Sequence, residues 1–145
     1  MMRAIFSFAL LFSMLSIKAQ TYNIDQLIGG KWMLLSVTGE LLNYETLEFY
    51  SKNIKDTFNG VDESCETSLL KYYLNPTVPI KFDFTKVGTK TSGKYIVIYI
   101  DEFKDFDYLE IKSLSKDCMT LYENANLEDE SLREDICYRK FKRVK

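Results

Sequence analysis

The stretch Leu27–Thr38, LIGGKWMLLSVT, decides how the rest of the chain is interpreted. Gly29 and Gly30 stand just before the run from Lys31 to Thr38. This run is rich in large apolar and β-branched residues, which favour a β-strand. Gly39-Glu40 then begins a turn. The sequence therefore predicts a first strand over residues 31–38, with glycine at its entrance.

Similar runs follow this stretch at fairly even spacing along the chain. They are Tyr44–Tyr50, Asn53–Phe58, Thr67–Leu74, Ile80–Thr85, Lys94–Ile100, Tyr108–Leu114, Cys118–Tyr122 and Ile136–Val144. Helical signals are few: Asn23–Ile28 favours one short turn, and Asn124–Asp135 a short helix or a loop. One all-β domain of eight or nine strands is expected. Both a closed up-and-down barrel and a sandwich accommodate such a series.

Composition excludes several classes of function. The chain has 145 residues and a net charge of −2, and it contains no histidine. Without histidine there is no Ser-His-Asp triad, no Cys-His pair and no HExxH zinc site. The 19 basic residues do not exceed the 21 acidic ones, so no electrostatic footprint for nucleic acid is present. We expect no cofactor and no metal.

Residues 1–19 are typical of a secretory signal peptide. Arg3 precedes a largely apolar stretch, Ala4–Ile17, and the small residue Ala19 stands where a signal peptidase would cut. The stretch is shorter than the roughly 20 residues of a membrane-spanning helix. A buried amino-terminal helix is the alternative interpretation. We expect a secreted or periplasmic protein whose folded domain is 20–145, with 17 basic and 21 acidic residues once Arg3 and Lys18 are removed.

Gly30-Lys31-Trp32, near the start of this domain, resembles the first motif of the lipocalins. The resemblance implies an antiparallel up-and-down β-barrel of about eight strands, preceded by a short helical turn. It also implies that Gly30 lets the chain cross the barrel base, that Trp32 plugs that end, and that Arg139 or Arg143 packs across the tryptophan ring. A partial counterpart of a second motif, Phe106-Asp107-Tyr108, is expected in a loop.

Three cysteines, Cys65, Cys118 and Cys137, lie in the expected domain. An exported chain meets an oxidising compartment, so one disulfide and one free thiol are the simplest expectation. A hairpin that joins the strand ending at Tyr122 to the strand beginning at Ile136 would place Cys137 near Tyr122 and not beside Cys118. This geometry disfavours the pair Cys118–Cys137. Lipocalins often tie the segment after the last strand to the middle of the barrel, and this resemblance implies a Cys65–Cys137 bond with Cys118 free.

The leading functional hypothesis is a monomeric protein that binds a small hydrophobic or amphipathic molecule inside the barrel, without catalysis. Strand alternation predicts an inward-facing set of Leu47, Phe49, Ile80, Phe82, Phe84, Leu109 and Ile111. A barrel filled by its own side chains, acting through its surface on a protein partner, is the alternative. A thiol enzyme using Cys118 is a third hypothesis, although nothing nearby in the sequence activates that thiol.

Overall fold

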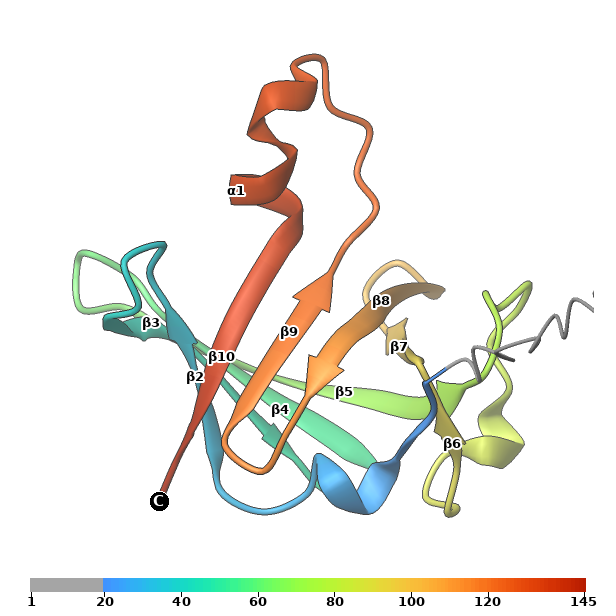
Figure 1. Ribbon diagram of the computed structural model, residues 1–145. Helices are drawn as coiled ribbons and strands as arrows, with labels where there is room; N and C mark the ends of the chain where they lie inside the picture. Colours follow the sequence, from blue (N-terminus) through green and yellow to red (C-terminus); the bar gives the residue numbers. More distant parts are fainter. Residues whose placement is uncertain (1–19) are drawn as a thin grey trace, which may run out of the picture.

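A computed structural model describes residues 20–145, so the expected signal segment 1–19 lies outside the described residues. Eight antiparallel strands form a closed ring (Figure 1). They are β2 (Lys31–Leu35), β3 (Leu41–Phe49), β4 (Asn53–Asn59), β5 (Cys65–Asn75), β7 (Tyr95–Ile100), β8 (Asp105–Leu114), β9 (Cys118–Tyr122) and β10 (Tyr138–Val144). Each strand pairs with the next in this order, and β10 pairs back with β2. The expected up-and-down barrel is confirmed.

Several shorter elements lie outside the eight-stranded ring. β1 (Tyr22–Asn23) pairs with β6 (Ser92–Gly93), and the 3₁₀ helices are η1 (Ile24–Gln26), η2 (Phe84–Lys86) and η3 (Glu130–Leu132). One short α-helix, α1 (Arg133–Cys137), leads into β10. η1 is the short turn that the sequence predicts before the first strand. Within residues 20–145, no helix has the length and apolar character needed to cross a membrane.

The expected strand Ile80–Thr85 is wrong, because this segment belongs to the connection between β5 and β7 and includes η2. β5 pairs directly with β7, with Asn75 opposite Tyr95, so the ring has no free edge for another strand at this point. The alternating aromatic residues of the segment, Phe82 and Phe84, pack on Tyr99 outside the barrel instead.

Alternation along the strands places one set of side chains in the barrel interior. Leu47 lies opposite Trp32 across the β2–β3 pair, and Leu109 lies opposite Ile96 across the β7–β8 pair. All four belong to one buried core cluster that also contains Tyr72, Leu74, Met119, Leu121 and Phe141. The barrel is therefore held by a continuous apolar core, as expected for strands with one face turned inward.

The lower end of the barrel, where η1 lies, is closed by Trp32. Its side chain is fully buried, and its indole Nε1 donates a hydrogen bond of 2.9 Å to the Leu27 carbonyl. The Arg143 guanidinium lies over the indole ring, 4.3 Å from its centroid, and also donates to the Gln26 carbonyl. These contacts tie β2, β10 and the chain after η1 together.

Gly30 occupies the bend between η1 and β2. Its φ of +74° lies in the left-handed region that disfavours residues with a Cβ. A Cβ there would also lie 3.1 Å from the Val144 carbonyl oxygen and 3.2 Å from Cγ of Arg143. Glycine is therefore required both by the backbone conformation and by the arginine that covers Trp32.

Substituting alanine for this glycine tests that account. We expect Gly30→Ala to lower the free energy of unfolding by about 2 kcal/mol, because left-handed backbone strain of roughly 1–2 kcal/mol is joined by crowding against Arg143. Gly39→Ala is the matched control, since Gly39 has a φ of +86° and open space around it. Urea unfolding measures both variants, and equal losses would contradict a role for the Arg143 contact.

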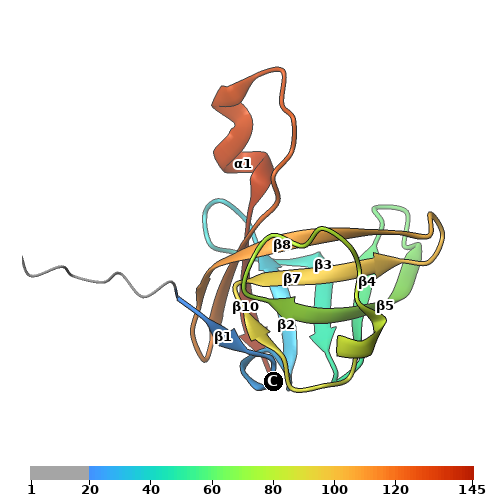
Figure 2. The same cartoon turned by 90° about the vertical axis from the view of Figure 1, so that its right-hand side faces the viewer.

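The connection from β9 to β10, residues 123–137, leaves the upper end of the barrel and stands away from it in both views (Figures 1 and 2). It contains η3 and α1, in line with the short helix that the sequence allowed. The Arg133 guanidinium bonds the Glu130 carboxylate and donates to the Tyr122 hydroxyl at 3.0 Å. Leu132 and Ile136 are 44% and 51% exposed on this projection.

The expected disulfide between Cys65 and Cys137 is not formed, and all three cysteines are free. Cys65 is exposed on β5, whereas Cys137 is buried where α1 meets β10. These strands are separated around the ring by β2, β3 and β4, which keeps the two thiols apart. Cys118 lies opposite Lys142, four pairs along β10 from Tyr138, so the expectation that it does not reach Cys137 holds.

The partial second motif is not in a loop. Phe106, Asp107 and Tyr108 pair with β7 inside β8, with Asp107 opposite Ile98. The three residues are part of the barrel wall, so they carry none of the loop role that the resemblance implied.

Candidate ligand-binding site in the barrel

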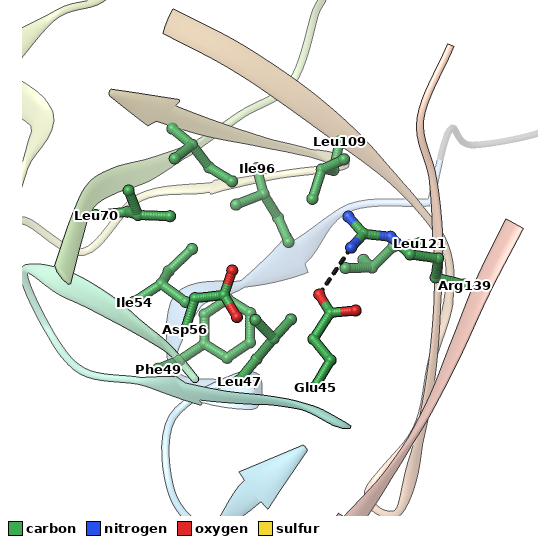
Figure 3. Close-up of a pocket in the computed structure, with 11 residues that line it drawn as sticks. Glu45, Leu47, Phe49, Ile54, Asp56, Leu70, Ile96, Leu109, Leu121 and Arg139 are labelled. Carbon is green, nitrogen blue, oxygen red and sulfur yellow. Dashed lines mark hydrogen bonds and ion pairs between the residues drawn. The ribbon is translucent and has the colours of Figure 1, made fainter. Parts of the chain in front are cut away.

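A small cavity of about 50 Å³ lies inside the barrel (Figure 3). Most of its wall is apolar, and three charged side chains also line it. The lining residues are Glu45, Leu47, Phe49, Ile54, Asp56, Leu70, Ile96, Ile98, Leu109, Leu121 and Arg139. An apolar cavity with a few convergent polar groups is the usual composition of a small-molecule site.

The three charged residues face the same cavity from strands β3, β4 and β10. Glu45 precedes Leu47 by two residues on β3, and Asp56 follows Ile54 by two residues on β4. Because side chains alternate along a strand, both carboxylates share the inward face with their apolar neighbours. The strand directions place both nearer the upper end than those neighbours. Arg139 enters from β10, where it pairs with Leu121 of β9.

Glu45 and Arg139 form the polar centre of the cavity. Arg139 Nη1 donates to Glu45 Oε1 at 2.8 Å, and Arg139 Nη2 lies 3.9 Å from Glu123 Oε2. Glu45 is buried, with only 8% of its surface exposed. Burial raises the pKa of the Glu45 carboxyl, and the attraction of Arg139 opposes that rise. The pair joins β3 to β10 across the interior.

Asp56 has no such partner. Its Oδ1 atom is buried and accepts no hydrogen bond. Burial raises the pKa of the Asp56 carboxyl above its ordinary value of 3.8, and the attraction of Arg139 again acts against the rise. In Figure 3 the carboxylate points into the space between β4 and the apolar side chains of the facing strands.

These directions predict how stability depends on pH. A carboxyl whose pKa is raised on folding binds a proton more readily in the folded than in the unfolded state. The loss of folding free energy caused by burying the Asp56 carboxylate is therefore absent below the ordinary pKa of 3.8 and fully present above the raised pKa of the folded state. We expect Asp56→Asn to unfold a few degrees higher than the natural protein at neutral pH, with the gap closing as the pH falls towards 3.8.

Thermal unfolding of both proteins across that pH range measures the gap. Taking the difference removes the contribution of carboxyls elsewhere, such as Glu110, whose pKa is lowered by hydrogen bonds from Lys112 and Lys94. A gap that is constant with pH would contradict a raised Asp56 pKa.

The structure separates the sequence-predicted ligand residues into two groups. Leu47, Phe49 and Leu109 line the cavity, and Ile111 is buried in the same core cluster. Ile80, Phe82 and Phe84 are wrong as interior residues: Ile80 is 96% exposed, and the two phenylalanine rings pack edge to face outside the barrel with centroids 4.8 Å apart. They cover β7 through Tyr99 because the segment that carries them is a loop.

Of the two arginines expected at the barrel base, only Arg143 lies there. Arg139 is wrong as a base residue, since its guanidinium pairs with Glu45 in the cavity. The two arginines lie four residues apart on β10 and therefore point to the same face, but at different heights in the barrel. Arg143 reaches the layer of Trp32, whereas Arg139 reaches that of Glu45.

Sequence reasoning missed the charged residues of the cavity, although a signal for two of them was present. Glu45 is in phase with Leu47 and Phe49, and Asp56 is in phase with Ile54. A carboxylate in phase with inward apolar residues indicates a buried charge, and buried charges are uncommon unless they are paired or functional.

Cys118 lies away from this cavity. Its thiol is exposed where β9 begins, at the end of the barrel opposite the projection. A cysteine in that position faces solvent and does not contact the interior groups.

No protein-family model matches the chain, and no curated protein matches it either. Among solved structures, the crystal structure of a lipocalin-like protein from Bacteroides uniformis ATCC 8492 is similar, with a TM-score of 0.48 and 14% sequence identity. The similarity covers 83% of this chain and 99% of that one.

Proposed function

We propose that the protein binds a small amphipathic molecule in the barrel cavity, without catalysing a reaction on it. The observation that carries this proposal is the group Glu45, Asp56 and Arg139 within an otherwise apolar interior. Taking charges out of water is costly, and apolar residues of similar volume would stabilise a purely structural core at least as well. Charged groups retained at such a cost are characteristic of functional sites.

The size of the cavity limits the ligand. Pockets for drug-sized molecules measure roughly 300–1,000 Å³, and a water needs about 10–15 Å³. A cavity of about 50 Å³ therefore holds a polar head group and the first carbons behind it. A longer ligand requires side chains at the upper end of the barrel to move apart. The proposed ligand is a short molecule with one polar end.

Ligand-observed NMR with a library of small amphipathic fragments tests this function. Ile98→Phe adds bulk to the cavity wall and is expected to weaken binding at least tenfold. Leu69→Phe is the matched control, because Leu69 is 61% exposed on the neighbouring strand β5. The proposal would be contradicted if no fragment in the library binds, or if both variants bind the fragments equally well.

A protein-interaction role is the second candidate, and the projection formed by residues 123–137 favours it. Leu132 and Ile136 expose apolar surface there, and neighbouring residues are acidic. Exposed apolar side chains rimmed by charge are a common feature of protein contact sites. Affinity capture from an envelope extract with the natural protein and a Leu132→Ser/Ile136→Ser variant tests this role. Identical captured proteins would contradict it.

Export is part of the proposal and is supported by the pattern of residues 1–19. Amino-terminal sequencing of the protein recovered from the periplasm or medium tests it. We expect the mature chain to begin near Gln20. A chain recovered from the cytoplasm with residues 1–19 intact would contradict export.

A further inference from the structure

The charges around the cavity are unbalanced. Two carboxylates, Glu45 and Asp56, line it together with one guanidinium, that of Arg139. Arg139 donates its 2.8 Å hydrogen bond to Glu45, and its other terminal nitrogen lies 3.9 Å from Glu123. The guanidinium of the cavity wall is thus paired with other carboxylates, which leaves the cavity with one more carboxyl group than it has cations.

The excess is localised at Asp56. Its Oδ1 is enclosed and unbonded, and the uncharged part of the cavity wall is apolar, with Ile54, Leu70 and Ile96 among its residues. Aliphatic side chains donate no hydrogen bonds, so the wall cannot satisfy this oxygen. An unsatisfied buried acceptor destabilises a protein, and a charged one more so. A ligand that brings a donor to this oxygen would remove that deficit.

We propose that the ligand of this cavity carries a protonated amine, which binds the Asp56 carboxylate while its alkyl portion packs against the aliphatic wall. This inference rests on the proposed function and adds the chemical class of the ligand. A carboxylate or phosphate ligand would face both Glu45 and Asp56 and be repelled. An alcohol would supply a hydrogen bond but leave the negative charge uncompensated. An ammonium group supplies both and is compact enough for the cavity.

Three probes of equal chain length separate these possibilities: hexylamine, hexan-1-ol and hexanoate. The polar head and first carbons of each are expected to fill the cavity of about 50 Å³, with the rest of the chain extending towards the upper end of the barrel. Their dissociation constants are measured by NMR titration of the natural protein at neutral pH. We expect hexylamine to bind at least tenfold more tightly than hexan-1-ol, and hexanoate to bind most weakly. Contacts between the alkyl protons of hexylamine and the methyl groups of Ile96 and Leu70 should be detectable, which places the probe in the cavity.

Two variants assign the preference to Asp56. Asp56→Asn should reduce the hexylamine preference over hexan-1-ol to less than twofold. Glu48→Gln is the matched control, since Glu48 lies on the neighbouring strand β3, outside the cavity lining, and pairs with Lys55 at 3.5 Å. This variant should keep the full preference. Cooperative thermal unfolding of both variants verifies that they are folded, and the ranking of the three probes on the natural protein needs no variant.

The outcomes distinguish this inference from the proposed function. If hexan-1-ol or hexanoate binds in the cavity as tightly as hexylamine, the ammonium inference is overturned and the binding function stands. If hexylamine binds equally well to Asp56→Asn, or contacts only surface residues, the inference is also overturned. If none of the three probes binds, both the inference and this form of the proposed function fall.

Discussion

Replacing Trp32 with alanine is expected to lower the free energy of unfolding by about 3–5 kcal/mol, the range for truncating a buried aromatic side chain. Trp32 is fully buried and closes the lower end of the barrel. The substitution opens a cavity, removes the 2.9 Å hydrogen bond to the Leu27 carbonyl and uncovers the Arg143 guanidinium. Urea unfolding followed by circular dichroism measures the loss.

A milder variant keeps this prediction testable if the alanine protein does not fold. Trp32→Phe keeps a ring under Arg143 but removes the indole N–H, so we expect an intermediate loss of about 1–3 kcal/mol from the unpaired Leu27 carbonyl and the lost volume. Met33→Ala is the matched control, because Met33 is the next residue on β2 and points to the other face of the wall. A larger loss for Met33→Ala than for Trp32→Ala would contradict the plug at the barrel base.

The second large effect is expected from Arg139→Met. This change leaves the Glu45 carboxylate buried without its 2.8 Å partner. Breaking a buried ion pair from one side typically costs about 3–5 kcal/mol, and the Arg139 side chain retains some contact with water. We therefore expect a loss of about 2–3 kcal/mol at neutral pH. Because burial already raises the pKa of Glu45, the loss should shrink as the pH falls and this carboxyl becomes protonated.

A double variant separates the unpaired charge from lost packing. Glu45→Met/Arg139→Met removes both charges and should return to within about 1 kcal/mol of the natural protein, since apolar replacements of buried pairs are often neutral. Lys55→Met is the control, as it breaks the more exposed pair with Glu48 and should cost less than about 1 kcal/mol. Equal losses for the double variant and Arg139→Met would mean that packing, and not the charge, sets the cost.

Local pattern was sufficient for most of the barrel wall. The expected runs between Tyr44 and Phe58 and between Lys94 and Tyr122 overlap most of β3, β4, β7, β8 and β9, although β3 and β8 each begin three residues earlier than expected. Alternating apolar residues between turn residues favour strands whatever their partners. The pattern failed over Ile80–Thr85. Those residues alternate equally well, but β5 pairs directly with β7 and leaves no edge for another strand. Strand pairing depends on the whole ring and not on local pattern alone.

The candidate site was only half predictable for a related reason. Leu47, Phe49 and Leu109 follow from alternation alone, since an apolar residue on an amphipathic strand faces the core. Arg139 does not, because Arg139 and Lys140 are adjacent in β10 and the sequence does not indicate which of the two turns inward. Closure of the ring by β10 against both β9 and β2 decides that it is Arg139.

The amino-acid sequence by itself therefore determined the all-β class, the position of most strands and the turn before β2, and its resemblance to the lipocalins implied Gly30 and Trp32 as residues of the lower end. These features depend on short-range pattern and on the chemistry of single residues such as Gly30 and Trp32. Only the tertiary structure decided that the cysteines stay apart, that Phe82 and Phe84 lie outside, and that two carboxylates and a guanidinium meet inside. Those outcomes depend on which strands become neighbours around the closed barrel and at what height each side chain enters it.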